Sequence, residues 1–252
     1  MRIKESTFEC KRGNLIIRGT EYLPEGEHLP AAICCHGFMA CQDRVRQYAK
    51  ACAAEGYAAY CFDFCGGSIP GTGKSDGETV NMSVLTEIED LEAVIGYVKS
   101  LPYIGEKLIL QGSSQGGFVA GLTAAKHPGL VDKLVMLYPA LCIPDDARAG
   151  SMRAASFDPD NIPEEFDCGP MRLGRCYPEA VNQMDAVSEI KKYEGPVLLI
   201  HGTADEIVSI EYSKAAHQAL KDSELVIIEG GAHGFAPEHD VTAINAIRSF
   251  VR

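Results

Sequence analysis

Ser114 is the residue of this sequence best placed to act as a nucleophile. It is the central residue of a G-x-S-x-G segment, residues 112–116, which follows the apolar run 108–110 and precedes a stretch that predicts a helix. A G-x-S-x-G between a strand and a helix is typical of a nucleophile elbow, a strained turn that holds the serine hydroxyl above the sheet. The first N–H groups of the helix would face an anion that forms there. The alternative is a glycine-rich turn in which the serine has no chemical role.

Two other residues complete the set that acyl transfer requires. Asp205 follows the apolar run 197–200, and His233 follows the run 225–228. Catalytic groups gather at the carboxyl ends of the strands in an open parallel sheet, so we expect both residues to meet Ser114 there. The order Ser, Asp, His along the chain agrees with a serine hydrolase built on such an elbow.

Each residue type has a defined task in this chemistry. A serine hydroxyl is a poor nucleophile unless a base takes its proton, and imidazole, with an ordinary pKa of about 6.5, can do so near neutral pH. His233 would be that base, and Asp205 would hold its ring in the useful tautomer. The backbone N–H groups of Gln115 and Phe38 are the expected donors of an oxyanion hole.

Other polar residues near predicted strand ends have simpler interpretations. His36 lies beside the expected oxyanion loop and should shape that loop, while His201 is expected to have a structural role. Asp63 also ends a strand, but a glycine-rich loop follows it, which favours a loop anchor. Ser113 is not the central residue of a G-x-S-x-G segment and should point away from the site.

Apolar strands alternate with amphipathic helices along most of the chain. This alternation predicts an α/β fold with a mostly parallel central sheet and helices on both faces, forming one domain over residues 1–252. A hairpin is expected over residues 8–18, and a loop over residues 22–30. The predicted strands of the sheet are 31–35, 57–62, 108–110, 134–137, 197–200 and 225–228, and the predicted helices are 44–55, 84–98, the elbow helix to about 127, 209–220 and 239–251.

The helix predicted over residues 84–98 is amphipathic. Its apolar residues recur at helical spacing, as expected for a helix that packs on a sheet. Glu87, Asp90 and Glu92 are interpreted as its solvated face.

Residues 141–193 interrupt the alternation of strands and helices. Strong apolar strands are missing there, and five prolines break the segment. A connection of roughly 50 residues is far longer than an ordinary loop. We interpret the segment as a lid insertion over the sheet that shapes a substrate pocket.

The composition indicates which kinds of partner and compartment to expect for this protein. A net charge of −12 and a sequence pI of about 5.0 argue against nucleic acid or an anionic membrane as a partner. No apolar run reaches membrane-spanning length, and no apolar signal core follows the N-terminal charges, so we expect a cytoplasmic protein. The 10 cysteines lack zinc-site spacing and are expected to be free thiols, without a metal site.

In these motifs the chain resembles the α/β-hydrolase superfamily, from about Ile33 to the C-terminus. The triad motifs are shared by many esterases, lipases and serine peptidases. Segments 157–163 and 173–177 also resemble the lid of the bacterial cinnamoyl (feruloyl) esterases. The other segments that carry the resemblance are 36–38, 112–117, 202–205 and 231–233.

This resemblance implies a substrate class and its contacts. It implies a serine carboxylesterase that hydrolyses hydroxycinnamic acid esters through an acyl-enzyme, with a small-molecule ester as partner, no cofactor, and a homodimer as an option. The positions that match the family's substrate contacts are Asp146 and Tyr177, and Asp145 could take the role of Asp146. A carboxylate and a phenol can both bond a ring hydroxyl, while apolar groups flank the ring.

Two other kinds of function stay open at this level. The same three groups would suit a general short-chain esterase, a monoacylglycerol lipase or a serine peptidase-like hydrolase. A non-catalytic ligand-binding protein on the same scaffold is a further alternative, although a binder has no need of all three groups.

Overall fold

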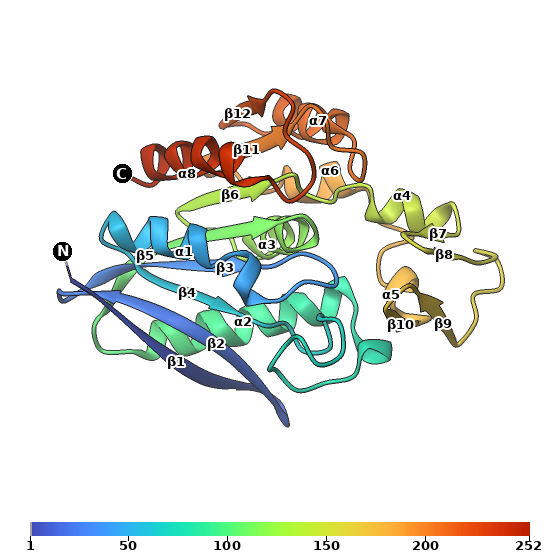
Figure 1. Ribbon diagram of the computed structural model, residues 1–252, viewed down its shortest axis with the longest axis horizontal. Coiled ribbons are helices and arrows are strands. Elements are labelled where there is room, and N and C mark those ends of the chain that lie inside the picture. Colours follow the sequence, from blue (N-terminus) through green and yellow to red (C-terminus); the bar gives the residue numbers. More distant parts are fainter. Residues whose placement is uncertain (1) are drawn as a thin grey trace.

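The computed structural model describes residues 2–252, which form a twisted eight-stranded sheet between two layers of helices (Figure 1). The strands are β1 (Ile3–Arg12), β2 (Leu15–Pro24), β3 (Leu29–Cys35), β4 (Ala58–Phe62), β5 (Ile104–Ser113), β6 (Lys133–Leu137), β11 (Val197–Gly202) and β12 (Ser223–Ile228). Their order in the sheet is β1-β2-β4-β3-β5-β6-β11-β12. The β1–β2 and β2–β4 pairs are antiparallel and the remaining pairs are parallel, so the predicted mostly parallel sheet is confirmed.

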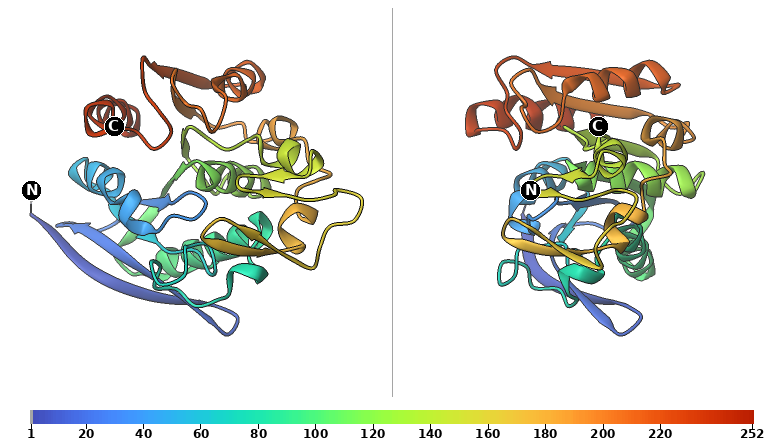
Figure 2. Two further views of the ribbon diagram at one scale, coloured as in Figure 1. Left: turned by 45° about the vertical axis from the view of Figure 1, so that its right-hand side comes forward. Right: turned by 90° about the vertical axis from the view of Figure 1, so that its right-hand side faces the viewer.

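Helices cover both faces of the sheet, as the sequence predicts. The main helices are α1 (Arg46–Ala54), α2 (Val84–Ser100), α3 (Gln115–Lys126), α6 (Ala186–Ile190), α7 (Ile210–Ala219) and α8 (Pro237–Val251), with 3-10 turns η1 (Gln42–Arg44) and η2 (Thr79–Asn81). α1 and α8 pack together on one face, and α2, α3, α6 and α7 lie on the other (Figure 2). Each face has its own core because successive strand residues point to opposite sides. Along β3, Ile33 and Cys35 enter one core, and Ala32 and Cys34 enter the other.

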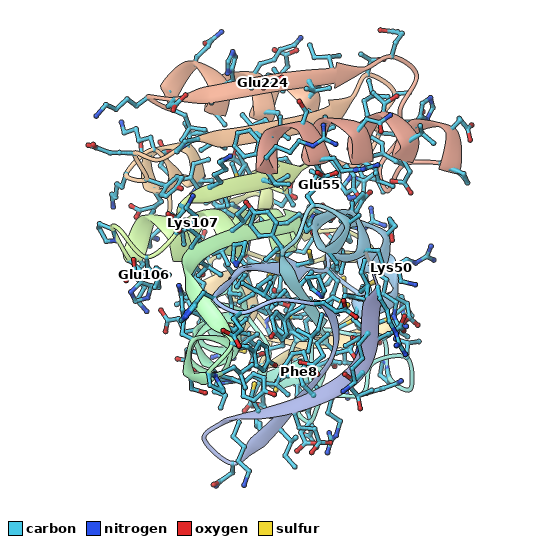
Figure 3. The ribbon with its side chains drawn as sticks, turned by 90° about the vertical axis from the view of Figure 1, so that its left-hand side faces the viewer. Phe8, Lys50, Glu55, Glu106, Lys107 and Glu224 are labelled. Atoms are coloured by element: carbon cyan, nitrogen blue, oxygen red, sulfur yellow. The ribbon has the colours of Figure 1, made fainter. Side chains whose placement is uncertain are left out.

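The N-terminal hairpin extends further than predicted. β1 and β2 are ten residues long and pair along their whole length. The predicted loop over residues 22–30 is therefore wrong at both ends, because residues 22–24 continue β2 and residues 29–30 begin β3. Phe8 fixes the hairpin on the domain, since its ring stacks on Tyr97 of α2 and meets Tyr60 of β4 edge-on (Figure 3).

The acidic residues of α2 do not form the solvated face that the sequence predicted. Glu87 is 1% exposed and Asp90 is fully buried, while Glu92 alone is partly exposed. Helical spacing explains the error, because Glu87 lies three residues after Val84 and therefore on the apolar stripe itself. Asp90 is compensated by Arg12 of β1, whose Nε lies 2.5 Å from its Oδ1. Packing by the hairpin and the elbow thus buries a side of α2 that looked polar in sequence.

Residues 141–193 leave the sheet after β6 and return to it at β11. They contain α4 (Ile143–Arg148), β7 (Ser151–Met152), β8 (Ala155–Ser156), β9 (Glu165–Cys168), β10 (Met171–Gly174), α5 (Cys176–Glu179) and α6. β7 pairs with β8 and β9 with β10, each as a small two-stranded sheet. Figure 1 shows α4, α5 and these small sheets grouped at one end of the central sheet, while α6 packs against α3 on its face.

Ion pairs join α1 to α8 on the opposite side of the molecule. Glu55, directly after α1, lies 2.5 Å from Arg248 Nε and 2.7 Å from Arg252 Nε (Figure 3). Hydrogen bonds from Arg252 and Arg248 lower the pKa of Glu55 to about 2. The C-terminal helix is therefore tied to the first helix of the domain by charge as well as by packing.

The 10 cysteines are free thiols, and most of them are buried. Within residues 2–252, no helix combines the length and the apolar character needed to cross a membrane.

Candidate active site

Ser114 lies at the turn between β5 and α3 in a backbone conformation that side chains rarely adopt. Its φ is 55° and its ψ is −121°, and such a residue costs about 1–3 kcal/mol unless its surroundings hold it in place. Glycine makes the turn possible, because a Cβ at Gly112 would collide with the carbonyl of Gly116, and one at Gly116 with the carbonyl of His36. The elbow therefore closes tightly against β3, as the G-x-S-x-G segment predicts.

The structure brings Ser114, His233 and Asp205 together from three separate strand ends. His233 Nε2 lies 2.9 Å from Ser114 Oγ, and His233 Nδ1 lies 2.8 Å from Asp205 Oδ2. An ionised carboxylate can only accept hydrogen bonds, so Nδ1 carries the ring proton and Nε2 is free to accept from the serine hydroxyl. This is the arrangement in which an imidazole can take a proton from serine.

Asp205 is held as the ionised form by four donors. Its Oδ1 accepts the backbone N–H groups of Ile207 and Val208 at 2.9 Å, and its Oδ2 lies 3.2 Å from Nε2 of His201 in addition to its contact with His233. Burial alone would raise the pKa of Asp205, but hydrogen bonds from His201, His233 and Val208 outweigh it and hold the pKa below its usual range. The carboxylate can therefore stabilise a positive charge on the ring of His233.

His201 has the structural position that the sequence predicts. It is fully buried, its Nδ1 lies 2.7 Å from Ser213 Oγ, and its Nε2 lies between the carbonyl of Val208 and Oδ2 of Asp205. Both neighbours of Nε2 are acceptors, so this nitrogen carries the proton. His201 thus fixes the loop after β11 and contacts the carboxylate of Asp205.

His36 is fully engaged in shaping the loop after β3. Its Nδ1 donates to the carbonyl of Gly37 at 2.8 Å, and its Nε2 accepts the backbone N–H of Phe64 at 3.1 Å. Burial lowers the pKa of His36, which favours the neutral ring that this pattern requires. Both ring nitrogens are occupied, so His36 has no nitrogen left to act as a base for Ser114.

The loop after β3 and the first turn of α3 both bring backbone close to Ser114. Gly37 packs so closely that a Cβ there would lie 2.9 Å from Cβ of Ser114, and the N–H of Phe38 belongs to the next peptide. The first backbone bonds of α3 run from Gly117 and Phe118 to the Ser114 carbonyl, which leaves the N–H of Gln115 outside the helical ladder. The role of Phe38 and Gln115 as oxyanion donors stays a prediction.

A cavity of about 50 Å³ lies beside Ser114. Its wall combines core residues with residues from the 141–193 segment, among them Asp146 of α4 and Tyr177 of α5. Burial raises the pKa of Asp146, and Tyr177 is almost fully buried. A larger cavity of about 310 Å³ lies along the glycine-rich stretch 64–79, and none of the three hydrogen-bonded residues lines it.

Asp145, the alternative to Asp146, faces elsewhere. It pairs with Arg148 and accepts the hydroxyl of Tyr212 at 2.6 Å, beside a cavity separate from the one at Ser114. These bonds hold its pKa below the usual range, the largest cause being the hydrogen bond from Tyr212. Of the two neighbouring aspartates, Asp146 is therefore the one that lines the cavity beside the serine.

Two residues near the site were missed in the sequence. Tyr138, directly after β6, places its ring 4.7 Å from that of His233, and nothing in the sequence distinguishes it from other residues after a strand. Glu87 of α2 accepts a hydrogen bond from Gln115 Nε2 at 2.7 Å. Its place on the apolar stripe of the helix was a signal that it points inward.

Comparison with protein families places most of this chain among known hydrolases. A family model described as "Serine aminopeptidase, S33" matches residues 26–160, more than half of the chain, and one described as "TAP-like protein" matches residues 170–252. The AB hydrolase superfamily protein YisY of Bacillus subtilis (strain 168) is 27% identical over 206 residues, which cover 69% of this chain and 75% of that protein.

Two solved structures of Est1E from Butyrivibrio proteoclasticus are similar over nearly the whole chain. The one with bound ferulic acid is 28% identical, covers 97% of each chain and superposes with a TM-score of 0.90. The other is 26% identical, also covers 97% of each chain, and has a TM-score of 0.86. The similarity therefore extends beyond the sheet and its helices into residues 141–193.

Proposed function

Because the chain belongs to the serine aminopeptidase S33 family of α/β-hydrolases, we propose that it is a serine carboxylesterase acting on esters of hydroxycinnamic acids such as ferulate. The observation that carries the chemistry is the unbroken hydrogen-bonded series from Asp205 through His233 to Ser114. The substrate class is supported by the similarity to a structure with bound ferulic acid and by the resemblance of residues 157–163 and 173–177 to an esterase lid.

Acylation begins when the Ser114 hydroxyl attacks the ester carbonyl. His233 Nε2 accepts the hydroxyl proton as the oxygen–carbon bond forms, and the ionised Asp205 stabilises the resulting imidazolium. The imidazolium then gives this proton to the departing alcohol oxygen, which leaves an ester between Ser114 and the acyl group. Water then attacks this ester as the same nitrogen takes its proton. The imidazolium returns that proton to the Ser114 oxygen as the acyl bond breaks, which releases the acid and restores the serine.

The tetrahedral intermediate of each half-reaction carries a negative oxygen that must be stabilised. In this proposal the backbone N–H groups of Phe38 and Gln115 donate to it, because both peptides border Ser114 and Gln115 opens helix α3. Loss of one such donor typically costs about 2.7–4 kcal/mol of transition-state stabilisation.

The 141–193 segment provides the acyl pocket in this proposal. The polar residues that it contributes to the cavity are Asp146, Arg153 and Tyr177, and the other residues that it contributes are largely apolar. We assign Asp146 and Tyr177 to the ring hydroxyl of the substrate. Ligand sites of this kind usually enclose about 300–1,000 Å³, so a cavity of about 50 Å³ must widen to admit a hydroxycinnamoyl group. We therefore propose that the segment acts as a lid whose side chains move apart when the ester enters.

The narrow cavity also favours a second candidate with the same chemistry. A short acyl group such as acetyl or butyryl needs less widening of the lid, which would make the protein a general short-chain esterase. A peptidase-like or monoacylglycerol substrate would likewise use the same three side chains.

A substrate panel separates these candidates. The kcat/KM values of methyl ferulate, a short nitrophenyl ester and a monoacylglycerol should be compared, since that ratio measures discrimination between substrates. The proposed function predicts that methyl ferulate is preferred after correction for the better nitrophenolate leaving group. Equal or greater turnover of an alkyl acetate than of the matching alkyl ferulate would favour the short-chain esterase instead.

A further inference from the structure

A buried series of hydrogen bonds links α2, the elbow and the 141–193 segment. The side-chain amide of Gln115 donates from Nε2 to Glu87 Oε2 at 2.7 Å, and the hydroxyl of Tyr177 donates to Gln115 Oε1. All three residues are buried, and they come from α2, α3 and α5. A carboxyl group in such a place is costly unless its neighbours bond it, so its presence here requires an explanation.

Glu87 determines which way the Gln115 amide points. An amide has a donor end and an acceptor end, and each end needs a complementary partner when it is buried. With the carboxyl oxygen of Glu87 accepting from Nε2, the amide oxygen is directed to Tyr177. A residue without an acceptor at position 87 would leave the amide free to turn or to lose its bond.

The orientation of the Gln115 amide determines whether Tyr177 can donate or only accept a hydrogen bond at the cavity wall. The Tyr177 hydroxyl has one proton, and that proton is given to Gln115. Tyr177 lines the cavity beside Ser114, and a ligand there that reaches this oxygen must therefore donate the hydrogen bond. An ionised Asp146 in the same wall would also be an acceptor, so a ligand group that meets these two residues must be a donor.

We propose that Glu87 is a positioning residue: it fixes the Gln115 amide so that Tyr177 accepts from the substrate, and the pocket thereby selects acyl groups that end in a hydrogen-bond donor. This role rests on the proposed function. It explains why the pocket would select hydroxycinnamoyl groups, and it assigns that selection to a residue that does not touch the substrate. Because Gln115 also directly follows Ser114, the same bond steadies the start of α3.

The test compares methyl 4-hydroxycinnamate with methyl 4-methoxycinnamate, which differ in the donor hydrogen and one methyl group. We expect the wild type to prefer the hydroxyl ester by at least about tenfold in kcat/KM, a typical effect of one buried hydrogen bond. Glu87→Leu should reduce this preference to about threefold or less. Glu87→Gln keeps an acceptor oxygen at the same place and should retain most of the preference.

Three further variants separate positioning from a general structural effect. Tyr177→Phe should also lose the preference, and adding Glu87→Leu to it should change the preference no further, since both act through one series of bonds. Glu92→Leu removes a carboxyl from the same helix that faces Lys126 and should keep the wild-type preference. Labelling of Ser114 by a fluorophosphonate shows which variants are folded.

Several results would overturn the inference. A Glu87→Leu protein that is labelled at Ser114 and keeps the wild-type preference would do so. If that variant does not fold, Gln115→Met removes the same two hydrogen bonds, to Glu87 and from Tyr177. A Gln115→Met protein that keeps the wild-type preference would also overturn the inference. A wild type that shows no preference for the hydroxyl ester would instead refute the proposed substrate class, and the selection by Glu87 with it.

Discussion

The Nε2 atom of His233 lies 2.9 Å from the hydroxyl oxygen of Ser114, although 119 residues separate the two along the chain. The contact forms because β5 and β12 run parallel in one sheet and end at the same edge. The distance is that of a hydrogen bond, so the imidazole is placed to accept the hydroxyl proton during attack. The proposed chemistry depends on this contact and on the carboxylate behind it.

Replacing the carboxylate of Asp205 by an amide should impair catalysis with little effect on folding. In Asp205→Asn, the amide can present its N–H to His233 and favour the wrong ring tautomer, so we expect kcat to fall by about 10³–10⁴-fold. Turnover of a nitrophenyl ester measures the effect, and thermal unfolding reports whether the variant is folded. A folded variant that loses less than tenfold would show that Asp205 is not the residue orienting His233.

The neighbouring aspartates of α4 provide a matched pair. Asp146→Asn removes a carboxylate from the cavity at Ser114, and we expect its KM for methyl ferulate to rise by about tenfold, as for the loss of one hydrogen bond to substrate. Asp145→Asn changes a residue that bonds Tyr212 and Arg148, and its KM should stay within about twofold of wild type. A KM that rises in Asp145→Asn and stays unchanged in Asp146→Asn would show that Asp145, and not Asp146, contacts the substrate.

Alanine substitutions at Gly116 and Gly96 should change the stability of the protein in opposite directions. Gly116→Ala would drive a Cβ into the backbone carbonyls of Cys35 and His36, and we expect it to lower the free energy of unfolding by more than about 2 kcal/mol. Gly96→Ala lies on the exposed side of α2 with no atom within 4 Å of the new Cβ, and it should add about 0.5–1 kcal/mol. Urea unfolding of both variants measures the difference. A neutral Gly116→Ala would mean that the elbow is less tightly closed than described.

The stability of the protein should depend on pH through Glu87. Burial raises the pKa of Glu87 well above its ordinary value, with a smaller opposing contribution from the hydrogen bond of Gln115. The folded form thus holds the proton more tightly than the unfolded chain, whose glutamate pKa is about 4.3. The stability from this group is complete below that pH and declines as pH rises through the folded pKa.

Glu87→Gln isolates this effect because glutamine does not titrate. The melting temperature of the variant minus that of wild type should increase between pH 5 and pH 8, by at least about 2 °C. The other titrating groups are common to both proteins and cancel in the difference. A constant difference over this range would show that Glu87 is not protonated in the folded protein at the lower pH.

The sequence was sufficient for the sheet and the elbow, because local signals determine both. Buried parallel strands appear as unbroken apolar runs, and the strained φ of Ser114 requires small residues at fixed positions around it. Asp205 and His233 followed from the rule that functional groups gather at the carboxyl ends of parallel strands. None of these inferences requires knowledge of what packs against what.

Tertiary contacts account for the features that the sequence did not predict. Glu87 and Asp90 look like a polar face of α2, yet they are buried by Gln115 and by Arg12, which lie 28 and 78 residues away. The short strands of residues 141–193 have at most four residues each, too few to show a period in sequence. The direction in which Asp145 and Asp146 point depends on how α4 packs, which spacing alone does not determine.

Covalent labelling of the nucleophile tests the central claim most directly. The wild type should be incubated with a fluorophosphonate and the adduct located by peptide mass spectrometry, in parallel with Ser114→Ala. We predict one adduct per chain, on Ser114, formed in step with the loss of esterase activity, and no adduct or turnover in Ser114→Ala. An adduct on another residue, or wild-type ester hydrolysis by Ser114→Ala, would contradict the account.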